Sequence, residues 1–243
     1  MSAGPIALVG SGEFTPAMED VDRELLEGRP RRVVFLPTAA APEGDRSLAY
    51  WVDLGRLHYT RLGVEALPLL VRNRVDAERS DLASAIAGAG LVYLSGGDPT
   101  YLAATLVRTR VGDAIVAAWQ RGAAVAGCSA GAVALTDHVP DVRHRGRPAT
   151  RGLALVPHIV VLPHFDQLER WAPGVTRWAL ESLPDDRLLI GVDEETAILG
   201  GTVEWRVRGR RRVWELRRGA DPIGHAAGEA FTTPLPPPQR KPG

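Results

Sequence analysis

The feature that most constrains the fold is an alternation of short apolar runs with longer helix-like segments between residues 6 and 192. Several of the apolar runs are continuous, as expected for strands of a parallel sheet that is covered on both faces. The alternation therefore predicts an α/β fold in which a doubly wound, mostly parallel sheet is sandwiched by helices. The predicted strands are residues 6–9, 33–36, 64–69, 91–94, 123–126, 159–162 and 188–192, and the predicted helices are residues 18–27, 46–62, 77–87, 101–107, 111–120 and 167–183.

After Asp193 the pattern changes to short strand-like stretches separated by glycines: TAILGG, TVEWRVRG and RRRVWELRRG. These stretches predict a small antiparallel C-terminal extension at one edge of the sheet. Arginines alternate there with Val and Trp, which is typical of a solvated edge that resists mispairing. We expect a single domain over residues 1–231 and a disordered, proline-rich tail over residues 232–243.

Composition excludes several classes of partner. Lys and Arg together number 29, as do Asp and Glu, so the neutral chain predicts no nucleic-acid partner and no membrane partner. A single cysteine excludes an internal disulfide framework and a cysteine-rich zinc site. The N-terminal stretch lacks the basic start and long apolar segment of a signal peptide, so a cytoplasmic location is expected. A homodimer is left open as a possible assembly.

The stretch GCSAG at residues 127–131 lies between a predicted strand and a predicted helix and fits the G-x-S-x-G pattern of a nucleophile elbow. Such a sharp turn holds its central side chain in a strained conformation at the carboxyl edge of the sheet, and flanking glycines avoid a collision. The central residue is Ser129, whereas Cys128 is one place off and is expected to point into packing. The same pentapeptide is also compatible with a turn that serves packing alone.

Other polar residues follow predicted strand ends. His164 follows the strand at 159–162, and an acidic group, DEE at residues 193–195, follows the strand at 188–192. Paired glycines at residues 96–97 follow the strand at 91–94, where their N–H groups would face a ligand. Because the carboxyl ends of parallel strands share one edge, we expect serine, histidine and acid to meet there.

At this point the chain resembles the serine dipeptidase E and cyanophycinase family, which shares its fold with class I glutamine amidotransferases. The resemblance covers roughly residues 5 to 218 and rests on VGSGEF, VVFLPTAAAP, LSGGD, GCSAGA, HF and GVDEETA. It implies that Ser129 is the nucleophile, His164 the general base and Glu194 the acid of the triad. It further implies that the N–H groups of Gly97 and Ala130 form the oxyanion hole.

The chain departs from the cyanophycinase pattern at several positions. Leu162 and Pro163 stand where cyanophycinases typically carry Asp-Gln, and Pro99 stands where they typically carry Gln. The basic motif after HF is reduced to Arg170, so cleavage of the branched Asp–Arg polymer is doubtful. Candidates for substrate binding are Asp98, Asp166 and Arg170. In the dipeptidase branch the acid lies between serine and histidine, an interval that contains Asp137 and Asp141. These two residues, together with Asp193 and Glu195 beside Glu194, are the alternatives to Glu194.

The expected function is that of a serine peptidase acting on a small peptide or an (iso)aspartyl-type peptide. Two alternatives stay open: a non-catalytic protein that binds a small molecule or peptide on the same fold, and an amidotransferase-like enzyme that uses Cys128. No metal or organic cofactor is expected. The glycines at residues 10 and 12 resemble the start of a dinucleotide-binding loop, but Thr15 occupies the third glycine position, which argues against NAD.

Overall fold

The main sheet has a parallel centre and an antiparallel edge. The computed structural model describes residues 2–201 and 203–234, and within them this sheet has the order β14-β11-β10-β1-β5-β4-β2-β3. Five neighbouring strands pair in parallel, in the order β1, β5, β4, β2, β3. Beyond β1 the sheet continues through β10, β11 and β14 in antiparallel pairs. The strands are β1 (Ile6–Val9), β2 (Arg32–Leu36), β3 (Glu65–Pro68), β4 (Leu91–Leu94), β5 (Ala124–Cys128), β10 (Thr196–Gly200), β11 (Glu204–Gly209) and β14 (Ala230–Thr232).

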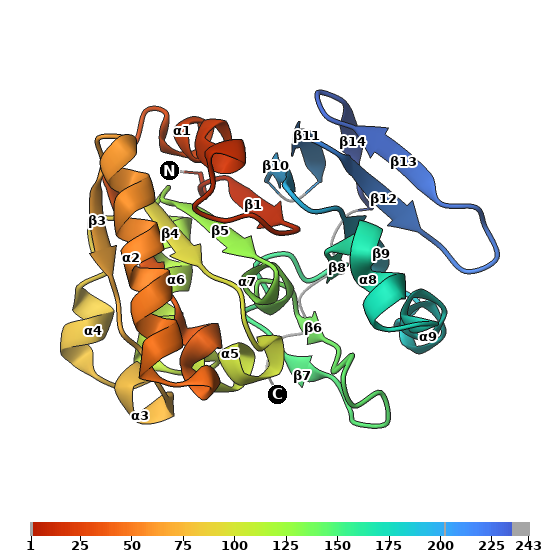
Figure 1. Ribbon diagram of the computed structural model, residues 1–243, viewed down its shortest axis with the longest axis horizontal. Coiled ribbons are helices and arrows are strands. Elements are labelled where there is room, and N and C mark those ends of the chain that lie inside the picture. Colours follow the sequence, from red (N-terminus) through yellow and green to blue (C-terminus); the bar gives the residue numbers. More distant parts are fainter. Residues whose placement is uncertain (1, 202, 235–243) are drawn as a thin grey trace.

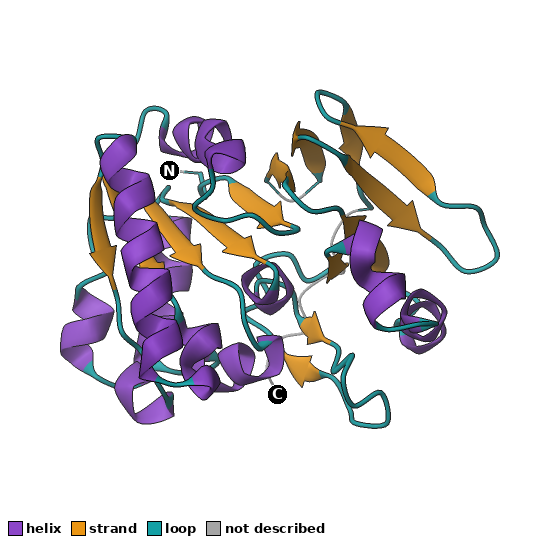
Figure 2. Ribbon diagram, in the orientation of Figure 1, coloured by secondary structure: helices purple, strands orange, loops and turns teal. Residues whose placement is uncertain are grey.

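Helices cover both faces of this sheet, as the apolar strands require (Figure 2). On one face, α1 (Glu19–Leu26) and α2 (Asp45–Arg61) lie in front of the strands in Figure 1. Their core includes Tyr59 of α2 together with Val33 and Phe35 of β2. On the other face lie α5 (Pro99–Leu106), α6 (Arg110–Gln120) and α7 (Ala130–Ala134). The predicted α/β class with helices on both faces of a mostly parallel sheet is confirmed.

Two of the predicted parallel strands belong to a second sheet, which corrects the expectation of one common edge. β8 (Ile159–Pro163) and β9 (Leu188–Val192) pair in parallel with each other, and β9 continues antiparallel to β12 (Arg212–Leu216) and β13 (Ile223–Ala226). This sheet lies beside the end of β1 in Figure 1. Both sheets contribute to one apolar core, in which Leu8 and Val125 join Ile190 and Val213, and this continuity supports a single domain.

Two predicted helices are interrupted. The segment predicted as one helix at 167–183 forms α8 (Phe165–Trp171) and α9 (Val175–Ser182), because Pro173 and the left-handed Gly174 (φ 73°) break it. The segment predicted at 77–87 is replaced by α3 (Arg74–Ala77), which Asn73 caps, and α4 (Ser80–Ser84). No helix in the described ranges is long and apolar enough to cross a membrane.

The C-terminal strands differ from the predicted edge extension because they are shared between the two sheets. β10 and β11 extend the main sheet, whereas β12 joins β9 in the second. The folded part continues past residue 231, since Thr232 ends β14 and Thr233 is buried. Residues 235–243 of the predicted tail lie outside the described residues. A short hairpin of β6 (His138–Val139) and β7 (Thr150–Arg151) was not predicted.

A buried polar contact joins the two helices on the front face of the main sheet. His58 of α2 places Nε2 2.7 Å from Oδ2 of Asp22 in α1, and both side chains are almost completely excluded from solvent. Burial is the main cause that raises the pKa of the Asp22 carboxyl, and the contact with His58 opposes it. Removing one partner would leave the other buried without compensation.

We therefore expect His58→Leu to lower the free energy of unfolding by about 3–5 kcal/mol, measured by urea denaturation. Asp20→Ala is the control, because Asp20 lies in the same helix as Asp22, the partner of His58, with its side chain fully exposed. It should change stability by less than about 0.5 kcal/mol. Equal effects of the two substitutions would show that the buried contact does not hold α1 to α2.

Candidate active site

Ser129 lies at a strained turn between β5 and α7. Its backbone has φ 49° and ψ −110°, which non-glycine residues rarely adopt. The turn is held by hydrogen bonds from Ser129 N to the carbonyl of Val9, at 2.9 Å, and from Val133 N to the carbonyl of Ser129, at 3.1 Å. The strain is therefore imposed by the strand before the turn and by the helix after it.

The flanking glycines are required by close backbone contacts. A Cβ added to Gly127 would come within 2.4 Å of the carbonyl of Gly131, and one added to Gly131 would come within 2.1 Å of the carbonyl oxygen of Leu94. Both glycines of the G-x-S-x-G pattern therefore exist for steric reasons, as predicted.

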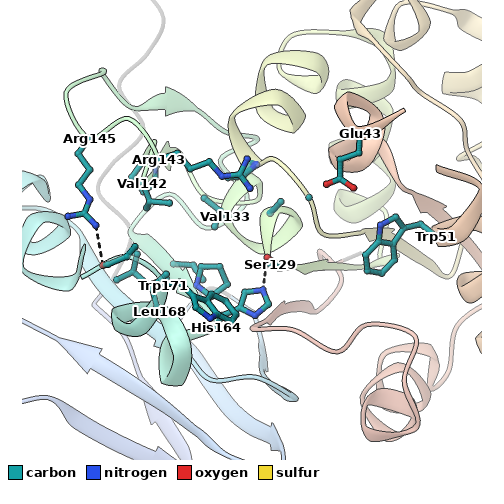
Figure 3. Close-up of a pocket in the computed structure, with 18 residues that line it drawn as sticks. Glu43, Trp51, Ser129, Val133, Val142, Arg143, Arg145, His164, Leu168 and Trp171 are labelled. Atoms are coloured by element: carbon teal, nitrogen blue, oxygen red, sulfur yellow. Dashed lines mark hydrogen bonds between the residues drawn. The ribbon is translucent and has the colours of Figure 1, made fainter. Parts of the chain in front are cut away.

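His164 and Glu194 are brought to Ser129 by the second sheet. His164 follows β8 and begins α8 in a left-handed conformation with φ 51°, and Glu194 lies in the turn after β9. His164 Nε2 lies 3.0 Å from Ser129 Oγ, a contact drawn in Figure 3, and its Nδ1 lies 3.0 Å from Glu194 Oε1. The three side chains form one hydrogen-bonded series, with about a quarter of the histidine and glutamate side chains exposed.

The other candidate acids are engaged elsewhere. Asp137 forms ion pairs with Arg151 and Arg187, and Asp141 accepts hydrogen bonds from His144. Of the neighbours of Glu194, Asp193 accepts hydrogen bonds from the Trp214 side chain and from the backbone of residue 212, and Glu195 pairs with Arg210. Within the described residues, Glu194 is the acid placed against His164.

The two residues predicted to form the oxyanion hole lie at the cavity beside Ser129. Gly97 and Ala130 both line the cavity that contains Ser129 and His164, and no hydrogen bond within the described part of the chain occupies either N–H group. Gly97 has φ 137°, and a Cβ there would come within 2.3 Å of the carbonyl oxygen of Ala39, so only glycine fits. Gly97, Ala130 and Ser129 thus line the same cavity, and the role of the two N–H groups stays a prediction.

Cys128 lies behind the turn and is completely buried, as predicted from its place in the pattern. Its Sγ donates to Oε2 of Glu13 at 2.7 Å, and the other oxygen of Glu13 accepts from Gly96 N at 2.7 Å. Burial, followed by the Glu13 carboxylate, raises the pKa of the Cys128 thiol well above its usual range. Sequence reasoning missed Glu13, although it stands in the quoted VGSGEF motif just after β1.

The cavity beside Ser129 has a volume of about 1050 Å³. Figure 3 shows Leu168 and Trp171 on one side of Ser129, and Glu43 and Trp51 on the other. Sequence reasoning missed these four residues and the cavity-lining Arg143 and Arg145, because no strand-end pattern marks them.

The two cavity-lining arginines differ in how they are held. Arg145 donates to the carbonyls of Ala172 and Pro173, at 3.1 and 3.0 Å, and stacks near Trp178. The Arg143 side chain is 70% exposed, and its one ion pair within the described part of the chain is with Asp98, at 3.6 Å. Arg143 is therefore the cation that can reorient toward a ligand.

The three predicted substrate-binding residues do not line this cavity. Asp98 caps α5 by accepting from Tyr101 N at 2.8 Å. Asp166 accepts from the backbone N–H of Glu194 at 2.9 Å and so supports the site from outside. Arg170 is exposed in the last turn of α8. Among the described residues, no group of three or more His, Cys, Asp or Glu side chains is arranged to hold a metal ion.

The fold and the site together define an α/β protein with a Ser–His–Glu series at a nucleophile elbow, the constellation of serine hydrolases. The chain belongs to peptidase family S51, whose sequence model matches residues 6–204. The family that the motifs indicated is thereby confirmed.

Individual relatives agree with this family. The cyanophycinase of Trichormus variabilis is 31% identical over 147 residues, which are 57% of this chain and 48% of that protein. The cyanophycinase of Synechococcus elongatus is 31% identical over 177 residues, 66% of this chain and 53% of that protein. The chain thus spans about half the length of the curated relatives it matches.

Solved structures give a wider overlap. The crystal structure of a peptidase from an acI-B1 actinobacterium has 38% sequence identity and a TM-score of 0.88, covering 95% of this chain and 97% of that one. A putative peptidase E protein from Listeria monocytogenes EGD-e has 18% identity and a TM-score of 0.60, covering 93% of this chain and 100% of that one. The second likeness concerns the fold alone.

The burial of Cys128 makes a prediction about its chemistry. The thiol should not react with Ellman's reagent in the native protein at pH 8, because it is shielded from solvent and its raised pKa keeps it protonated. In denaturing guanidinium chloride it should react fully. A native reaction as fast as that of the denatured chain would contradict the described environment of Cys128.

Proposed function

We propose that this protein is a serine peptidase in which Ser129 is the nucleophile, His164 the general base and Glu194 the group that orients His164. The observation that carries the proposal is the pair of 3.0 Å contacts that joins Ser129 Oγ to His164 and His164 to Glu194. Membership of peptidase family S51 supports the same reaction class.

The chemistry follows from these contacts. His164 Nδ1–H donates to Glu194, which leaves Nε2 free to take the proton of Ser129 as its Oγ attacks the peptide carbonyl. The imidazolium then gives this proton to the leaving amine, and the C–N bond breaks to leave an acyl-enzyme. A water molecule, deprotonated by His164, attacks the acyl carbon, and Ser129 is released with its proton restored.

The negative charge that forms on the carbonyl oxygen needs donors that are already in place. The N–H groups of Gly97 and Ala130 have no partner within the described part of the fold and line the cavity beside Ser129. Each such donor is worth about 3 kcal/mol of transition-state stabilisation. Glu13 holds the neighbouring Gly96 N–H, so that group is not available as a donor.

The lining of the cavity favours a small peptide as substrate. Pro99, Leu162 and Pro163 line it with apolar surface where cyanophycinases typically carry polar residues, which argues against a branched Asp–Arg polymer. Arg143 supplies a cation that can meet a substrate carboxylate, in keeping with a peptide that contains an aspartyl or isoaspartyl group.

The two rival functions make different use of the same site. An amidotransferase-like reaction at Cys128 would need a thiolate exposed to substrate, whereas this thiol is buried and protonated against Glu13. A non-catalytic binding protein would have no use for a serine held at φ 49° against a histidine, because strain of this kind must be supported by the surrounding fold. Labelling of Ser129 decides between the second rival and the peptidase.

Ser129→Ala should abolish labelling by a fluorophosphonate and should lower kcat/KM on a panel of dipeptides and β-aspartyl dipeptides by about 10⁴- to 10⁶-fold. The reason is that no other serine, threonine or cysteine among the described residues lines the cavity. Cys128→Ala is the matched control, since it removes the adjacent nucleophile, and it should retain labelling. Folded wild-type protein that is not labelled would favour the binding protein. Loss of activity in Cys128→Ala, with activity retained in Ser129→Ala, would favour the amidotransferase-like enzyme.

The assignment of the acid has a separate test. Glu194→Gln should lower the rate of labelling by about 10³- to 10⁴-fold, because the histidine loses the carboxylate that orients it. Asp137→Asn and Asp141→Asn should be labelled at nearly the wild-type rate, since these aspartates contact other residues. A larger loss in either asparagine variant than in Glu194→Gln would move the assignment to that aspartate.

Arg143→Ala should raise KM for an aspartyl dipeptide by about tenfold and leave KM for a neutral dipeptide unchanged, because only the first offers a side-chain carboxylate. Arg147→Ala is the matched control, as Arg147 is a similarly exposed arginine of the same loop that does not line the cavity. Equal KM changes for both dipeptides would show that Arg143 does not read the substrate charge.

A further inference from the structure

Three consecutive arginines, residues 210–212, form the arginine turn: two connect β11 to β12 and the third begins β12. The proposed reaction assigns them no role. They belong to the basic stretch that the sequence alone presents as a solvated hairpin. We infer that this arginine turn, acting through Asp166, positions the triad carboxylate of Glu194, and that Arg211 and Asp166 are positioning residues for the reaction. The inference rests on the proposed function.

The topology places the arginine turn directly beside the acidic turn that contains Glu194. β9 leads through residues 193–195 into β10, and β11 leads through residues 210–211 into β12. Thr196 pairs with Gly209 in the main sheet, and Val192 pairs with Val213 in the second. Two short connections, the acidic residues 193–195 and the basic residues 210–211, therefore cross between the sheets side by side.

Asp166 connects these two segments. Its Oδ1 accepts the backbone N–H of Glu194 at 2.9 Å, and its Oδ2 accepts a hydrogen bond from the guanidinium of Arg211. Because both oxygens of the Asp166 carboxylate are bonded, these two partners constrain its orientation. Arg211 also donates its backbone N–H to Oγ1 of Thr196 at 3.0 Å, and this bond fixes the backbone from which its side chain extends.

The residues on either side of Glu194 are held by the same arginine turn. Asp193 accepts the backbone N–H of Arg212 at 3.1 Å. The carboxylate of Glu195 accepts from the Arg210 guanidinium at 2.8 Å, and its carbonyl accepts the Arg210 N–H at 2.9 Å. With both neighbours fixed, the Glu194 side chain is the carboxylate of this turn that reaches His164.

Charge gives a second reason for the arginines. Four carboxylates lie close together here: Asp166, Asp193, Glu194 and Glu195. Burial raises the pKa of Asp193. The charge of Asp166 raises this pKa further, and the charge of Arg211 lowers it. Without the guanidinium groups, mutual repulsion would disfavour a close ionised cluster. The Arg211 charge thus favours the ionised form of Asp193, in addition to the contacts that hold the acidic turn in position.

The experiment measures labelling by a fluorophosphonate in the full chain, with KI and kinact determined separately and the melting temperature recorded for each variant. Arg211→Ala and Asp166→Asn should lower kinact by about 10- to 100-fold with KI within about twofold, because the serine is activated less well while the cavity is unchanged. Arg211→Lys should recover part of the loss, since it keeps the charge. The double variant should lose no more than the larger single loss.

The matched control is Arg206→Ala, an exposed arginine of β11 whose side chain has no hydrogen bond or ion pair within the described ranges, and its kinact should equal that of the wild type. If Arg211→Ala does not fold, Arg211→Lys and Asp166→Asn carry the same test. A kinact within about twofold of wild type in Asp166→Asn and Arg211→Ala, even with a lower melting temperature, would overturn the inference and leave the proposed function standing. Wild-type protein that is not labelled would instead overturn the proposed function itself.

Discussion

The strained backbone of Ser129 is the constraint on which the rest of the site depends. At φ 49° and ψ −110° the serine cannot continue β5, and it cannot begin α7 with ordinary helical geometry. The surrounding fold maintains this conformation through the hydrogen bond to Val9, the contact of the two elbow glycines, and the contact of Gly131 with β4. Because every one of these restraints is backbone or glycine, the serine is held without using any polar side chain that catalysis would need.

A serine fixed in this way sets where its partners must arrive, and they arrive from a different sheet. Ser129 follows a strand of the main sheet, whereas His164 and Glu194 follow strands of the second. The 3.0 Å contact between serine and histidine therefore depends on how the two sheets pack against each other. The continuous apolar core that they share fixes their relative position. Changes in this core, far from the cavity, should be felt at the site because packed interiors transmit small displacements.

Polar side chains around the site are divided between reaction and support. Glu13 and Cys128 form a buried pair behind the elbow, and Glu13 also holds Gly96, which is adjacent to the cavity-lining Gly97. Asp166 supports Glu194 from the opposite direction. These acids are drawn away from the cavity by hydrogen bonds to backbone N–H groups, which leaves Glu194 as the acid directed at His164. Residue type alone does not distinguish such supporting carboxylates from a reacting one.

The sequence by itself determined the α/β class, the parallel centre of the main sheet and the elbow at Ser129, because strand periodicity and a G-x-S-x-G turn are local properties. It also brought His164 and Glu194 forward as strand-end residues, and their catalytic roles stay a prediction. Only the tertiary structure decided that β8 and β9 form a second sheet, that Arg143 lines the cavity while Asp98 does not, and that residues 210–212 meet the acidic turn. Those facts depend on contacts between segments far apart in the chain, and no local pattern encodes which distant surface a loop will meet.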